Sequence, residues 1–134
     1  MIVADTNLIA SLLIEREQSD VARAVWLKDS DWMLPTLWRS EFLNVLTISV
    51  RVGVLTLADA HETWKLALAL FDDSEIEPVG DDVLDMAAAR KLTAYEAQFA
   101  VAAAHLHVPL VTSDRDLLKV CPSIAIAPER FAAA

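Results

Sequence analysis

Two short apolar segments near opposite ends of the chain, each followed by an aspartate, constrain the fold most strongly. Residues 1–5 read MIVAD and residues 108–114 read VPLVTSD, so Asp5 and Asp114 stand directly after apolar, β-branched stretches. Short continuous apolar runs of this kind are typical of strands that are buried on both faces of a parallel sheet. The pattern therefore predicts two buried strands, each with a carboxylate at its carboxyl end.

The remainder of the chain alternates between short strand candidates and longer helical patterns. Further strands are expected within residues 31–35 (DWMLP), 76–79 (IEPV) and 124–128 (IAIAP). Alternation of this kind predicts an α/β fold with a mostly parallel sheet covered by helices on both faces. Helices are expected over residues 6–13, 19–28, 36–51, 57–71, 81–91, 94–105 and 114–119.

Local signals mark several helix ends. Pro35 stands where the third helix can begin, because an N–H group at the start of a helix would have no bonding partner within the helix. Gly53 stands where the same helix can end. Thr56 and Asp59 mark the start of the next helix.

Composition and charge limit the class of protein. A chain of 134 residues with 55% hydrophobic residues and two glycines predicts a single domain over residues 1–134 without a flexible linker. The net charge of −9 argues against binding of nucleic acid by a broad basic surface. The one cysteine, Cys121, is expected in the core and fits a reducing compartment. Without a signal peptide or a long apolar run, the chain is expected to be cytoplasmic.

Asp5 and Asp114 allow two interpretations. Either aspartate alone is best explained as an N-cap, because each stands where the chain enters a helix. Ligands of open α/β sheets, however, collect at the carboxyl ends of the strands. Two equivalent placements on two buried strands favour a shared site.

Glu41 is predicted on the core-facing side of its helix. At 100° per residue it lies with Leu37, Trp38, Val45, Ile48 and Val52, and nearly opposite Arg39. A buried carboxylate is costly unless it is paired or binds a metal. We therefore expect a functional role for Glu41, and the alternative is a salt bridge to a lysine or arginine.

Glu96 also has two possible roles. Thr93-x-x-Glu96 is a capping box, in which each side chain bonds to the other residue's backbone N–H. On the helical wheel Glu96 also lies with Phe99, Ala100 and Ala103, a face that can approach a strand closely. Capping and metal ligation are compatible.

Converging carboxylates repel one another unless a cation lies between them. An all-oxygen site with open water positions suits Mg²⁺ or Mn²⁺. Such an ion would also allow an acidic protein to bind a polyanion locally.

Four segments, in this order and at these spacings, resemble the motifs of PIN-domain ribonucleases, specifically the small VapC-type toxins of toxin–antitoxin pairs. These segments are VADTN (3–7), WRSEFLNVL (38–46), LTAYEAQFAVAA (92–103) and PLVTSDRDLLK (109–119). The resemblance implies a PIN-like three-layer sandwich, with a five-stranded, mostly parallel sheet flanked by helices. It also implies a metal-dependent endoribonuclease that cuts single-stranded or loop RNA with Mg²⁺ or Mn²⁺.

The resemblance assigns roles residue by residue. It implies a metal-binding and catalytic role for Asp5, Glu41, Glu96 and Asp114, an additional acid at Asp116, and supporting polar roles for Thr6, Asn7 and Thr112. Simple helix capping is an equally good explanation of the last three. The family pattern is Tyr-Asp-Ala where this chain has Tyr95-Glu96-Ala97, so the carboxylate gains a methylene and a torsion.

The resemblance further implies a homodimer and a small antitoxin partner. Trp26, Trp32, Trp38 and Trp64 are candidates for interface anchors or for core packing, and core packing is favoured for Trp38.

Three other functions are compatible with some of these residues. The first is a PIN-like module that binds RNA or protein but cuts poorly because of Glu96. A receiver-type phospho-switch needs a lysine where Asp114 stands, and a haloacid-dehalogenase phosphatase needs a second aspartate after the DTN of residues 5–7. A nucleophile–histidine pair is not expected, because all three histidines are predicted on the surface.

Overall fold

The computed structural model describes all 134 residues. Its sheet has the order β3-β2-β1-β4-β5, and every neighbouring pair is parallel. The strands are β1 (Ile2–Ala4), β2 (Trp32–Pro35), β3 (Glu75–Ile76), β4 (Leu110–Val111) and β5 (Ala125–Ile126). The predicted α/β fold with a five-stranded parallel sheet is confirmed.

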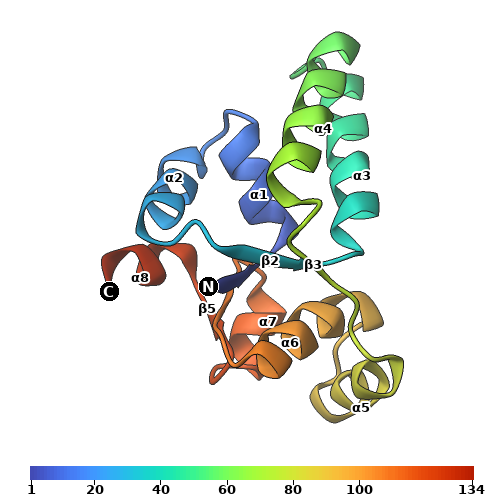
Figure 1. The fold of residues 1–134 in the computed structure, drawn as a ribbon, viewed down its shortest axis with the longest axis vertical. Helices are drawn as coiled ribbons and strands as arrows, with labels where there is room; N and C mark the ends of the chain where they lie inside the picture. The colour runs from blue at the N-terminus through green and yellow to red at the C-terminus, as the bar shows by residue number, and fades with distance from the viewer.

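Eight helices cover the two faces of the sheet (Figure 1). They are α1 (Thr6–Leu13), α2 (Ser19–Lys28), α3 (Trp38–Arg51), α4 (Leu57–Phe71), α5 (Gly80–Arg90), α6 (Ala94–Leu106), α7 (Arg115–Val120) and α8 (Pro128–Ala133). Helices α1 to α4 lie on one side and α5 to α7 on the other, which gives the three-layer arrangement. No helix combines the length and the apolarity needed to cross a membrane.

Each face of the sheet has its own core. The core beneath α1 to α4 is rich in aromatic residues, and Trp32 and Trp38 are 1% and 0% exposed. Trp26 lies edge-on to Trp32 with ring centroids 5.1 Å apart, and Trp64 lies 5.8 Å from Trp38. All four tryptophans therefore pack in or against the core, as the second interpretation of these residues predicted.

The opposite core is built on small side chains of α6. Ala97, Ala100 and Ala103 are fully buried there and pack with Val3 and Leu110 of the central strands. Because alanine keeps the helix close to the sheet, the N-terminus of α6 lies near the strand ends.

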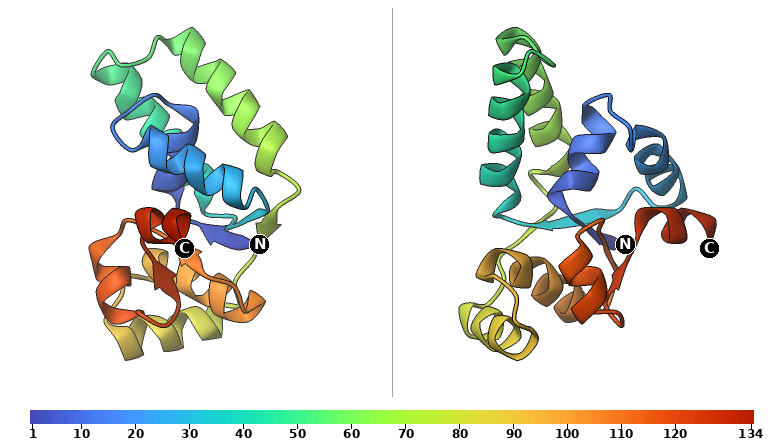
Figure 2. Two further views of the ribbon diagram at one scale, coloured as in Figure 1. Left: turned by 90° about the vertical axis from the view of Figure 1, so that its left-hand side faces the viewer. Right: turned by 180° about the vertical axis from the view of Figure 1, so that it is seen from behind.

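Two predictions about α3 are wrong. Pro35 belongs to β2, where it pairs with Ile76 of β3, and the helix begins only at Trp38. The lack of an N–H is tolerated there because the next residue, Thr36, donates to the Ile76 carbonyl. Ile48 and Val52 are 47% and 66% exposed instead of core-facing. Figure 2 shows the reason: α3 and α4 form a hairpin that extends beyond the sheet, so the end of α3 has no strand beneath it.

The remaining helix signals agree with the structure. Gly53 has a φ of +81° directly after α3, and Thr56 and Asp59 form a complete capping box at α4. Cys121 is buried, as expected. The short helix α8, which starts at Pro128, was not predicted; it packs beside α2, and Phe131 and Ala132 contact the first core.

Candidate metal centre

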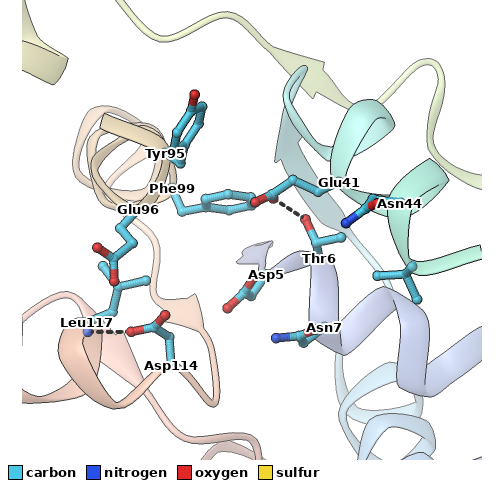
Figure 3. A pocket seen from close by; sticks show the side chains of 11 residues that line it. Asp5, Thr6, Asn7, Glu41, Asn44, Tyr95, Glu96, Phe99, Asp114 and Leu117 are labelled. Atoms are coloured by element: carbon cyan, nitrogen blue, oxygen red, sulfur yellow. Dashed lines mark hydrogen bonds between the residues drawn. The ribbon is translucent and has the colours of Figure 1, made fainter. Parts of the chain in front are cut away.

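The carboxyl ends of β1 and β4 open into an acidic pocket of about 270 Å³ (Figure 3). The two strands are neighbours at the centre of the sheet, so the residues that follow them meet. The pocket is lined by Asp5, Thr6, Asn7, Glu41, Asn44, Val45, Tyr95, Glu96, Phe99, Asp114 and Leu117. All four acids predicted to bind metal therefore line one cavity.

Asp5 faces the pocket and does not cap α1. It occupies the N-cap position, but its side chain makes no capping hydrogen bond. The side chain is nearly buried, and its Oδ2 accepts a hydrogen bond from the Thr112 hydroxyl. Burial raises the pKa of Asp5, and the nearby Asp114 carboxylate raises it further. Burial therefore disfavours the charged form of Asp5, and a nearby cation would favour it.

Glu41 reaches the same pocket from the first turn of α3. Its Oε1 accepts a hydrogen bond of 2.7 Å from the Thr6 hydroxyl. Burial raises the pKa of Glu41, and the charge of Asp5 adds to the effect. The alternative of a salt bridge is wrong, because no lysine or arginine pairs with Glu41; Arg39 bonds to Glu75 on the other side of the helix.

Asp114 and Glu96 lie across the pocket from Glu41 and are held by helix N-termini. Asp114 accepts a hydrogen bond of 2.9 Å from the Leu117 N–H at the start of α7. The predicted capping box is complete: Glu96 accepts from the Thr93 N–H at 3.0 Å, and Thr93 Oγ1 accepts from the Glu96 N–H at 3.1 Å. Both acids therefore cap a helix and line the pocket at once.

Thr112 connects the two sides of the site. Its hydroxyl donates to Asp5 and accepts a hydrogen bond of 3.0 Å from the Asp114 N–H. The residue is fully buried, so its rotamer is set by packing. A single side chain thus fixes the position of one acid from β1 and one after β4.

Asp116 lies at the exposed edge of the site. Although it does not line the pocket, one oxygen each of Glu96, Asp114 and Asp116 lie within 4.8 Å of one another. Glutamate at position 96 therefore reaches Asp114 and Asp116 despite its added methylene, whereas Asp5 and Glu41 lie outside this group of three.

The donor set fits a hard divalent cation. None of the five acids forms an ion pair with a lysine or arginine, and every candidate ligand atom is a carboxylate oxygen. Carboxylate oxygens that no lysine or arginine neutralises are the kind of ligand that Mg²⁺ and Mn²⁺ prefer. A nucleophile–histidine arrangement is absent, since His61, His105 and His107 are all exposed and outside the pocket.

Three pocket residues, Asn44, Tyr95 and Leu117, were not predicted from the sequence. Asn44 lies one helical turn after Glu41, and this spacing alone was sufficient to place it on the same face. Tyr95 is 63% exposed, and no sequence signal distinguishes a rim position from a core position for a tyrosine.

Comparisons with known proteins support this description of the fold. The structure is similar to PAE2754 from Pyrobaculum aerophilum, with a TM-score of 0.75 and 27% identity over 99% of this chain and 90% of the other. It also resembles the fold of FitAcB from Neisseria gonorrhoeae, with a TM-score of 0.71 and 17% identity over 96% and 99% of the two chains. A search of curated proteins found no match. The sequence model of the PIN domain matches residues 2–121, and the chain therefore belongs to the PIN domain family.

Proposed function

We propose that this protein is a metal-dependent endoribonuclease that hydrolyses phosphodiester bonds of RNA. The observation that carries the proposal is the convergence of Asp5, Glu41, Glu96 and Asp114 in one pocket without any basic side chain to balance them. Membership of the PIN family and the resemblance of the four motifs to PIN-domain ribonucleases support the same activity.

In this proposal the four acids hold Mg²⁺ or Mn²⁺, directly or through water. The ion would lower the pKa of a water molecule and stabilise the charge that develops on the phosphoryl group. Thr112 and Thr6 orient Asp5 and Glu41 by donating to them, which leaves the second oxygen of each carboxylate for the pocket. Asp116 adds negative charge at the edge of the same group.

The rim of the pocket favours unpaired RNA as the substrate. Tyr95 is the one exposed aromatic side chain in the chain, and it stands beside the acids. Stacking on an exposed aromatic ring is how proteins bind splayed bases with little sequence preference. In Figure 3 the Tyr95 ring projects from α6 next to Glu96, on the side of the helix that faces away from Asp114.

The cellular role that we propose is that of a toxin in a type II toxin–antitoxin pair, acting in the cytoplasm as a homodimer. This rests on the VapC-type motifs and on the exposed apolar side chains of the α3–α4 hairpin, such as Leu43, Ile48 and Leu57, which suit a protein partner. Size-exclusion chromatography with light scattering would contradict the dimer if the chain is monomeric at micromolar concentration. Co-purification with the product of an adjacent short reading frame tests the antitoxin.

The competing function is a PIN-like module that binds RNA or protein without cutting, because Glu96 replaces aspartate. The distance between Glu96 and Asp114 favours the enzyme, since the glutamate carboxylate still reaches its neighbours.

Incubation of defined single-stranded and hairpin RNAs with the purified chain decides between the two functions. We expect endonucleolytic cleavage in Mg²⁺ or Mn²⁺ and none in EDTA. Binding of RNA without cleavage in either metal would contradict the nuclease and support the module.

A further inference from the structure

A second groove, of about 230 Å³, adjoins the acidic pocket, and Asn7 lines both. It lies between α1, the turn that joins α1 to α2, and the loop after β4. Its polar lining consists of Asn7, Ser11, Arg16, Gln18 and Ser113. The groove is thus a continuation of the acidic pocket with a different chemistry.

The groove contains no carboxylate, although the chain carries 20 acidic residues. Its one charged residue is Arg16, whose guanidinium forms no ion pair. The nearby Arg23, in contrast, pairs with Glu15 and Asp20. An unpaired cation beside an acidic pocket, in a protein of net charge −9, is available to an anion from outside.

Ser11 adds a hydroxyl group to the lining of the groove. It is 6% exposed, and its hydroxyl forms no hydrogen bond within the protein. No fully buried side-chain polar atom lacks a partner, so the small exposed part of Ser11 is where its hydroxyl meets the groove. From there the hydroxyl can donate a hydrogen bond to water or to a phosphate oxygen in the groove.

We propose that this groove binds the phosphodiester next to the one that is cleaved. Arg16 supplies the positive charge, and the Ser11 and Ser113 hydroxyls with the Asn7 amide supply donors for phosphate oxygens. A base is a poorer occupant, because the lining has no aromatic side chain on which to stack. The proposal rests on the nuclease function: an RNA strand would pass from the rim at Tyr95, over the acids, into the groove beyond Asn7.

Binding tests the groove without relying on catalysis. Fluorescence anisotropy of a labelled single-stranded RNA is measured in Mg²⁺ at several salt concentrations, with Asp5→Asn as the background. Loss of one phosphate contact in Arg16→Ala should reduce the slope of log K against log salt by about 0.7. Arg51→Ala is the matched control, because Arg51 is also exposed and unpaired but lies at the far end of α3.

Cleavage by the otherwise unmodified protein locates the phosphate. A set of short RNA substrates carries one neutral methylphosphonate linkage, placed at a different position in each. At one position beside the scissile bond this linkage should slow cleavage about 10-fold, because a hydrogen bond to a charged phosphate is lost. Arg16→Ala should abolish this sensitivity, and Ser11→Val, which narrows the groove and removes the hydroxyl, should reduce it.

The outcomes separate the two proposals. If Arg16→Ala lowers the slope of log K against log salt and the chain cuts no RNA, the groove binds an RNA phosphate but the nuclease function fails. If the chain cuts RNA but Arg16→Ala behaves like Arg51→Ala in both assays, the groove proposal is overturned. Retention of the full methylphosphonate effect in Arg16→Ala overturns it as well. Circular dichroism spectra confirm that each variant is folded.

Discussion

The acidic pocket contains two pairs of carboxylates that are held in different ways. Asp5 and Glu41 are held by threonine hydroxyls, and burial raises the pKa of both. Glu96 and Asp114 are held by backbone N–H groups at the N-termini of α6 and α7, where the helix dipole favours negative charge.

The difference indicates which pair of acids a bound cation would stabilise more. All four acids lie at helix N-termini, but Glu96 and Asp114 accept backbone hydrogen bonds there. Asp5 and Glu41 accept hydrogen bonds from threonine hydroxyls instead, and burial raises the pKa of both. We therefore expect the bound ion to compensate mainly the hydroxyl-held pair. Thr112 links the two pairs, because its hydroxyl bonds to Asp5 and to the Asp114 backbone.

Removing one charge from the hydroxyl-held pair should have the largest effect. Asp5→Asn should reduce cleavage more than about 100-fold, because changes in the outer shell of a metal site alone cost 10- to 100-fold. Its Tm without metal should equal or exceed that of the unmodified chain, since a buried charge has been removed. RNA cleavage and thermal unfolding measure the two effects. Retained Mg²⁺-dependent activity would refute the assignment of Asp5.

Removing the connecting hydroxyl should have the next largest effect. Thr112→Val deprives Asp5 of a donor and the Asp114 N–H of an acceptor, so we expect a loss of metal affinity of about 10- to 100-fold. Thr6→Val affects one hydrogen bond to the half-buried Glu41 and should weaken binding less. The rise in Tm on addition of metal measures the metal affinity of each variant and so ranks them. Thr112→Ser should restore the metal affinity. The reverse ranking would contradict the connecting role.

Shortening the acid on α6 tests the pair held by helix N-termini. Glu96→Asp should leave the helix intact, because the Thr56–Asp59 box of α4 shows that aspartate closes a capping box in this same protein. We expect cleavage to change less than about 10-fold, since the helix N-terminus and its charge remain. Activity that rises from almost none would instead support the binding module.

The smallest effect concerns pH and stability without metal. Because the pKa values of Asp5 and Glu41 in the folded state exceed the ordinary 3.8 and 4.5, the folded state binds these protons more tightly than the unfolded chain. Proton binding by these two acids therefore stabilises the folded state fully at pH values below their pKa values in the unfolded chain. This stabilisation is lost as the pH rises through their pKa values in the folded state.

The difference in Tm between the unmodified chain and Asp5→Asn, measured in EDTA, isolates this contribution from other carboxylates. Relative to the variant, the unmodified chain should lose a few degrees of Tm as the pH rises. Saturating Mg²⁺ should remove the loss, and a pH-independent difference would show that Asp5 is not destabilised by burial.

Much of the fold follows from local patterns in the sequence. Short apolar runs predict strands β1 and β4. Most predicted helix limits agree with the structure to within one residue, because caps such as Thr56 and Thr93 are local signals. The helix wheel placed Glu41 and Glu96 on inward faces, and both line the pocket. The wheel failed for Ile48 and Val52, because periodicity cannot reveal where the sheet ends beneath a helix.

The sequence by itself determined the order of the elements up to β5, the acids after two buried strands and the capping box at Glu96. Each of these depends on residues that are neighbours along the chain. Tertiary structure alone decided that Asp5 and Asp114 face the same pocket, and that Thr112 bonds to Asp5 over 107 positions of sequence. It also decided that Asn7 joins the acidic pocket to the groove of Arg16 and Ser11. These features arise where distant segments pack together, and no local preference specifies which side chains will meet there.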